Sequence, residues 1–222
     1  MITTVELTNL LSEVTGWPRH DIAMRTRYLI PSGLLPRGGR GLNAPHLDDH
    51  HIAAMIIATL VGGVQTDAPK LVRSVGSLTA CGVWIEKFGD IGPIVRRSTQ
   101  SNESKATECQ NIFPDGITFI EAIYNILNIL RTGDKKGSFI GSIGGAIGTM
   151  EIAGGVYGLV LLNVIGDWST GKQMQIDFGQ DVWPEILAKS EKDHSLISRI
   201  TMIPRPALVR IAEATRQGEN HD

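Results

Sequence analysis

The amino-acid sequence predicts an α+β protein in which a small helical module precedes a larger mixed domain. In roughly the first 60 residues, apolar side chains recur at helical spacing with turn signals between them. From about residue 138 onward, apolar and polar residues alternate as in strands and glycine is frequent. The 222 residues are enough for two domains, and we expect the boundary near Gln65, giving domains of residues 1–64 and 66–222.

The N-terminal module should contain three helices and one loop. A threonine can cap the first helix, a Thr-Gly pair breaks it, and a proline suits the first turn of the second helix. Four glycines and two prolines make the next stretch a loop or short hairpin, and two aspartates open the third helix. The expected elements are helices over residues 4–14, 19–29 and 48–60, with the loop over residues 32–45.

The larger domain should combine an antiparallel sheet with flanking helices. Apolar residues at helical spacing predict a helix over residues 68–79, and Thr118 and Glu121 have the spacing of a capping box ahead of a broad apolar face. A short turn over residues 167–172 joins two strand candidates. The strand candidates are residues 138–147, 149–153, 156–165, 173–178 and 197–203, and further helices are expected over residues 182–189 and 205–216.

The composition is that of an ordinary globular protein, with 42% hydrophobic and 20% charged residues. The net charge of −2 argues against a protein that binds nucleic acid over its whole surface. The apolar stretches are interrupted by glycine and fall short of the roughly 20 residues of a membrane helix. The N-terminus lacks the basic and apolar regions of a secretory signal, so we expect a cytoplasmic protein with no membrane partner.

The order of helix, tight turn, helix, basic loop and helix is that of a winged helix-turn-helix. In such a module, the second helix enters the major groove of duplex DNA, and the wing and helix ends bind phosphates. Between residues 19 and 40 the chain carries five arginines and one acid, Asp21, so this segment is cationic. The residues predicted to contact DNA are Arg19, His20, Arg25, Arg27, Tyr28, Arg37 and Arg40.

The segment after the second helix resembles the MerR family. Residues 27–36 read Arg-Tyr-Leu-Ile-Pro-Ser-Gly-Leu-Leu-Pro, and in that family an arginine and an aromatic residue are likewise followed by a short spacer and Gly-Leu-Leu-Pro. The glycine- and arginine-rich residues 37–43 and the acidic helix start at Asp48 and Asp49 fit the same plan. This resemblance covers residues 3–60. It implies backbone contacts by Arg27 and Tyr28 and wing contacts by Arg37 and Arg40.

The sequence therefore favours a sequence-specific DNA-binding transcriptional regulator, and the arrangement also resembles regulators of phages and mobile elements. The long dimerising helix of MerR proteins is absent, so self-association or partner binding would fall to residues 66–222. We expect a homodimer, because one small module buries too little surface for tight operator binding and a two-fold assembly reads two half-sites. Two alternatives are a nucleoprotein-assembly component, such as an excisionase or packaging recognition subunit, and a ligand-binding protein with its site in the C-terminal sheet.

A cluster of potential metal ligands lies at the start of the third helix. His46 and His50 have a spacing that could face one metal ion if both lay on one helix. Pro45 and the acidic helix start instead favour a capping role for Asp48 or Asp49, with His46 ahead of the helix. We therefore expect no metal site here.

Residues 166–172 have the glycine and lysine spacing of a phosphate-binding loop. Such a loop needs Ser or Thr next, to hold magnesium, and then a helix. Here Gln173 follows, and the next residues alternate like a strand, so we expect a hairpin turn. With no further catalytic motif, we expect neither catalytic residues nor a cofactor.

Overall fold

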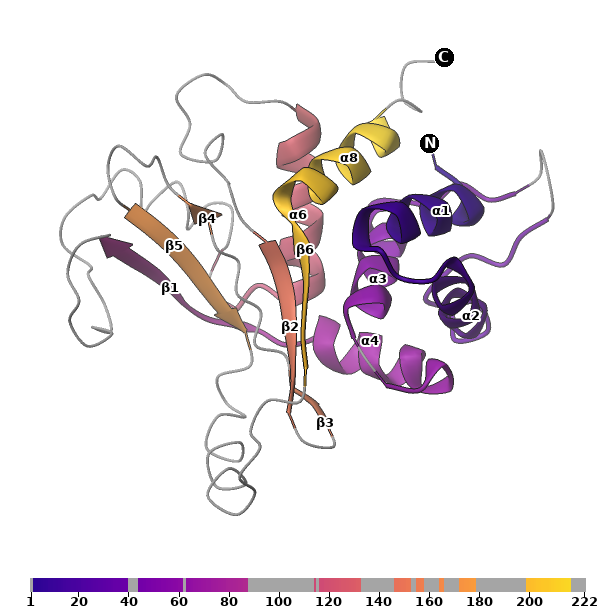
Figure 1. Ribbon diagram of the computed structural model, residues 1–222, viewed down its shortest axis with the longest axis horizontal. Helices are drawn as coiled ribbons and strands as arrows, with labels where there is room; N and C mark the ends of the chain where they lie inside the picture. The colour runs from indigo at the N-terminus through magenta and orange to yellow at the C-terminus, as the bar shows by residue number, and fades with distance from the viewer. Residues whose placement is uncertain are drawn as a thin grey trace.

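A helix that is apolar on every side lies at the centre of the protein. In the computed structural model, the other helices pack around this helix, α3, and two small antiparallel sheets lie to one side of it (Figure 1). The structure describes residues 2–39, 44–61, 63–87, 114, 116–132, 146–152, 155–157, 164–165, 172–178 and 199–216. The helices there are α1 (Thr4–Thr15), α2 (Arg19–Leu29), α3 (Asp49–Leu60), the short 3₁₀ turn η2 (Gln65–Asp67), α4 (Ala68–Gly76), α6 (Phe119–Thr132) and α8 (Arg205–Arg216).

A short turn separates α1 from α2, as the sequence predicts. The Thr3 hydroxyl accepts a hydrogen bond from the Glu6 backbone nitrogen at 3.4 Å, and the Glu6 carboxylate accepts one from the Thr3 backbone nitrogen at 2.8 Å. Hydrogen bonds from the backbone and the hydroxyl of Thr3 hold the pKa of Glu6 below its ordinary value. Gly16 ends α1 with a φ of 71°, which a side chain would strain. The predicted positions of both helices are confirmed.

The central helix α3 begins at an aspartate cap, as predicted. Asp48 Oδ1 accepts a hydrogen bond from the backbone nitrogen of His51 at 2.9 Å, and His51 Nδ1 accepts one from the Asp48 backbone nitrogen at 3.3 Å. Every residue from 52 to 61 is buried, and the helix contacts α1, α2, α4, α6 and β6. Because its side chains are apolar all round, α3 is stable only when other elements cover all of its faces.

The strands form two separate antiparallel sheets. One sheet has the order β1-β5-β4 and the other has the order β3-β2-β6. The strands are β1 (Ala80–Lys87), β2 (Ala146–Ile152), β3 (Gly155–Tyr157), β4 (Val164–Ile165), β5 (Lys172–Phe178) and β6 (Arg199–Pro204). The predicted mixture of helices with antiparallel strands is confirmed, although β1 was not among the expected strands and β2 continues through two candidates that the sequence separates. The helix expected over residues 182–189 lies outside the described residues.

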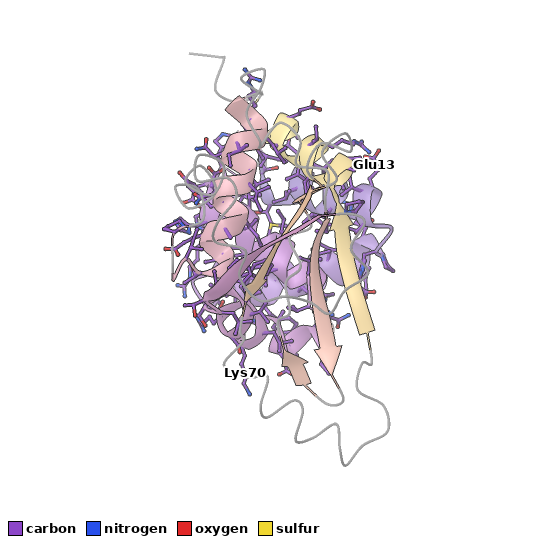
Figure 2. All side chains as sticks on the ribbon, turned by 90° about the vertical axis from the view of Figure 1, so that its left-hand side faces the viewer. Glu13 and Lys70 are labelled. Carbon is purple, nitrogen blue, oxygen red and sulfur yellow. The ribbon has the colours of Figure 1, made fainter. Side chains whose placement is uncertain are left out.

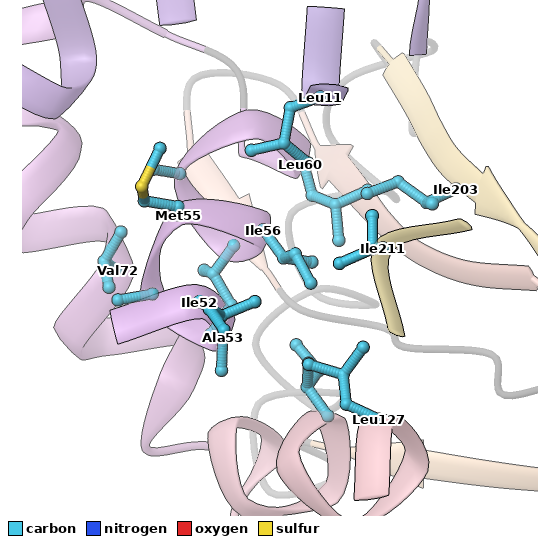
Figure 3. Close-up of a cluster of buried hydrophobic side chains, with 14 of the residues drawn as sticks. Leu11, Ile52, Ala53, Met55, Ile56, Leu60, Val72, Leu127, Ile203 and Ile211 are labelled. Carbon is cyan, nitrogen blue, oxygen red and sulfur yellow. The ribbon is translucent and has the colours of Figure 1, made fainter. Parts of the chain in front are cut away.

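The helices after residue 65 complete the core begun by the helices before it. α6 and α8 pack against each other, α6 also covers α3, and α8 covers α1. Figure 3 shows Leu127 of α6, Ile203 of β6 and Ile211 of α8 turned toward Leu60 and its neighbours on α3. Helices on both sides of the expected domain boundary therefore share one hydrophobic core.

Polar contacts between the helices reinforce this packing. Arg131 of α6 forms an ion pair with Asp49 of α3, and its Nε donates a hydrogen bond to the Thr215 hydroxyl of α8 at 2.8 Å. Arg210 of α8 pairs with Glu13 of α1 at 2.7 Å. Within the described part of the chain, no helix is long and apolar enough to cross a membrane.

Candidate nucleic-acid interface

One face of α2 is buried against the helical core and the opposite face is open. In Figure 1, α2 lies at the end of the molecule farthest from both sheets. His20, Met24 and Arg27 follow one another at helical spacing along the open face, where His20 and Arg27 are exposed. The Arg27 guanidinium lies 3.9 Å from the Met24 sulfur. Arg19 is exposed in the first turn, and Tyr28 is half-buried at the edge of this face.

Arg25, which the sequence predicts to contact DNA, lies inside the protein instead. Its side chain is 3% exposed, its Nη2 donates a hydrogen bond to the Gly63 carbonyl oxygen at 2.8 Å, and its guanidinium carbon lies 5.4 Å from the centre of a Trp17 ring. The reason is helical phase, because Arg25 falls on the same face as the buried residues Ile22 and Leu29. A side chain in this position is unavailable to DNA.

Arg25 instead helps to fix the position of α2. A second contact acts beside it, since Gln65 Nε2 donates a hydrogen bond to Asp21 Oδ1 at 3.0 Å. The two contacts tie α2 to the residues that lead into α4. These positioning residues were missed because nothing local in the sequence connects Asp21 or Arg25 with residues 63–65.

The basic loop is closed at its base. Gly38 lies so close to Pro45 that a Cβ at this position would stand 2.0 Å from the proline Cδ, so only glycine fits. The chain then returns beside the residues that precede α1, where Thr3 and His46 form an antiparallel bridge and the Leu47 backbone nitrogen donates to the Ile2 carbonyl oxygen at 2.9 Å. Arg37 is exposed just before this closure, whereas Arg40 lies outside the described residues.

The exposed cations of this region are not neutralised by neighbouring carboxylates. Among the described residues, Arg131 and Arg210 pair with acids. In contrast, no described carboxylate lies within 4.0 Å of the charged nitrogens of the cations around α2 and the loop. These cations are Arg19, Arg27, Arg37 and two residues of α4 that the sequence interpretation missed, Lys70 and Arg73. With no described carboxylate beside them, these groups can donate hydrogen bonds to phosphates or base edges, although one donor of Arg73 already bonds to the Ser32 carbonyl oxygen.

The other candidate sites take structural roles in the part of the chain that is described. No group of three potential metal ligands lies close enough there to hold an ion. His51 belongs to the cap of α3, and the His50 ring stacks on Tyr124 at a centroid distance of 5.8 Å. β5 begins at Lys172 and pairs antiparallel with β4, so a strand stands where a phosphate-binding loop needs a helix. The antiparallel pairing of the strands on either side of the predicted hairpin turn is confirmed, whereas residues 166–171 of the turn lie outside the described residues.

No protein-family model matches the chain, and no curated protein or solved structure shows significant similarity to it.

Proposed function

We propose that this chain is a sequence-specific DNA-binding protein that regulates transcription, with residues 1–64 acting as a winged helix-turn-helix. The observation that carries the proposal is the open face of α2. This face follows α1 across a short turn and bears exposed cations without described acidic partners. A helix with one free polar face and a fixed opposite face has the form that enters the major groove.

The side chains on the open face suit different parts of duplex DNA. Arg27 can donate two parallel hydrogen bonds to guanine or bind a phosphate, and His20 can bond to either. Met24 supplies an apolar contact between them, of the kind that meets a thymine methyl group. Arg19, in the first turn, would bind a phosphate and set the register of the helix. Arg25 is no part of this contact set, because it is buried.

The closed loop supports the assignment of a wing. Its base is held by the contact of Gly38 with Pro45 and by the bridge between Thr3 and His46, so Arg37 projects from an anchored segment. The resemblance of residues 27–36 to the MerR family points to the same function. We include Arg40 and Tyr28 in the proposal as backbone contacts. We also propose a homodimer, since two copies would read two half-sites.

Selection from random duplexes with the full-length protein tests the proposal, followed by salt titration of binding. Enrichment of one sequence is expected, and Arg27→Ala and Arg37→Ala should each lower the salt slope by about 0.9, the value for one lost phosphate contact. Arg216→Ala is a matched control, because this exposed arginine lies at the end of α8, away from α2 (Figure 1). Selection of no sequence, together with unchanged binding in both variants, would refute the proposal.

A further inference from the structure

We propose that α4 belongs to the same DNA-binding surface, and that Lys70 and Arg73 bind phosphates of the duplex backbone beside the segment that α2 contacts. This inference rests on the proposed function. It adds a second helix to an interface that the sequence assigned to α2 and the loop alone.

The first argument is that α4 packs against α2. Near the start of α4, Gln65 bonds to Asp21, and the Gly63 carbonyl oxygen accepts from Arg25, both on α2. Farther along α4, Arg73 Nη2 donates a hydrogen bond to the carbonyl oxygen of Ser32, just beyond the end of α2. These contacts, together with the packing of α4 against α2, place the two helices next to each other.

The second argument is the chemistry of the open face of α4. Ala68, Val72 and Val75 face the core, whereas Lys70 and Arg73 are exposed one turn apart. Ser74 shares this exposed face, and its hydroxyl is a common type of phosphate donor, whereas the hydroxyl of Ser77 donates to the Ser74 carbonyl oxygen at 3.1 Å. The exposed acid of this segment, Asp67, precedes the helix and lies within 4.0 Å of neither cation.

The third argument is the uneven distribution of charge. Exposed Arg210 of α8 is paired with Glu13, while α2, the loop and α4 together expose five cations with no described carboxylate beside them. Figure 2 shows Lys70 projecting at one end of the molecule and Glu13 lying at the other. A chain with a net charge of −2 that gathers cations without described carboxylate partners on adjacent elements has a local surface suited to a polyanion. Five phosphate contacts would give a salt slope of about −4.5 per protomer.

The test measures binding of the full-length protein to its selected duplex as a function of salt. Lys70→Gln should lower the magnitude of the slope by about 0.9, and Lys70→Gln with Arg73→Gln by about 1.8, with the preferred sequence unchanged. Arg73→Lys keeps the charge and should keep the slope. Arg216→Gln removes one exposed charge from α8 and should also leave the slope unchanged.

The outcomes separate this inference from the proposed function. A wild-type protein that binds no duplex would refute both. A wild-type protein that selects a sequence, with the same salt slope in Lys70→Gln and in the double variant, would overturn only the role of α4. A change in the preferred sequence of the double variant would also overturn it, because the two residues would then act by positioning α2. Lys70→Gln removes a side chain with no hydrogen bond or ion pair to any described residue, so it provides the clean measurement if the Arg73 variant unfolds.

Discussion

Substitution of Ile211 in α8 tests whether the C-terminal helix completes the core of the N-terminal module. Ile211 is fully buried, and Figure 3 places it opposite Leu60 of α3. Ile211→Ala removes three buried carbons, which at about 0.8 kcal/mol each amount to about 2.4 kcal/mol. A cavity that collapses only in part raises the cost toward about 4 kcal/mol. For a chain of this length, the melting temperature should fall by about 2 to 4 °C per kcal/mol.

The assay combines urea unfolding followed by circular dichroism with amide hydrogen exchange. Because α8 and α3 share one core, the loss of stability should accelerate exchange of the buried amides of α1 and α3 together with those of α8. Arg216→Ala, on the exposed side of the same helix, should change the unfolding free energy by less than about 0.5 kcal/mol. Faster exchange confined to α8, with α1 and α3 unchanged, would show that the N-terminal helices are stable without it.

Two further predictions concern polar groups. Arg25→Gln should lower the unfolding free energy by about 1 to 3 kcal/mol, because the Gly63 carbonyl oxygen loses a buried charged donor. The exposed Arg19→Gln is the control and should cost under about 0.5 kcal/mol. Equal effects of the two substitutions in urea unfolding would contradict the buried position of Arg25. The pKa values of Glu6 and Glu121 are lowered by hydrogen bonds from their capping threonines, so the stability from both caps should be fully present above about pH 4.5 and be lost as the pH falls through the lowered values. Unfolding free energies between about pH 6 and pH 3 should therefore decline less in the double Glu→Gln variant than in the wild type, and parallel curves would argue against both caps.

Sequence signals were most informative where the determining contacts are local. The helices α1, α2 and α3 lie where capping residues, a Thr-Gly pair and prolines place them. At Thr118, the predicted capping spacing corresponds to hydrogen bonds from its backbone nitrogen and hydroxyl to the Glu121 carboxylate at 2.9 and 2.6 Å. These signals act within one helical turn, so a single sequence contains all the information they need.

Charge composition was a poorer guide to the candidate interface than helical phase. Five arginines between residues 19 and 40 suggested one cationic stripe, but Arg25 shares the buried face of Ile22 and Leu29. The spacing of Ile22, Arg25 and Leu29 at three and four residues is enough to predict that Arg25 lies on the buried face. The proposed contribution of α4 has no comparable signal, since the contact of Arg73 with Ser32 joins residues 41 positions apart in the sequence. The packing of α8 on α1 is likewise a contact between distant parts of the sequence.

The packing of α1 against α8, and of α3 against α6 and β6, also determines when the core can form during synthesis of the chain. A ribosome completes α3 at Leu60 well before it reaches α8 at Arg205, and at about 5 to 20 residues per second this interval is on the order of 7 to 30 s. During that time, the apolar sides of α3 that α6 and β6 later cover are without their final partners. A nascent chain that has completed α2 therefore still lacks α6 and β6, which complete the core around α3, the helix against which α2 packs.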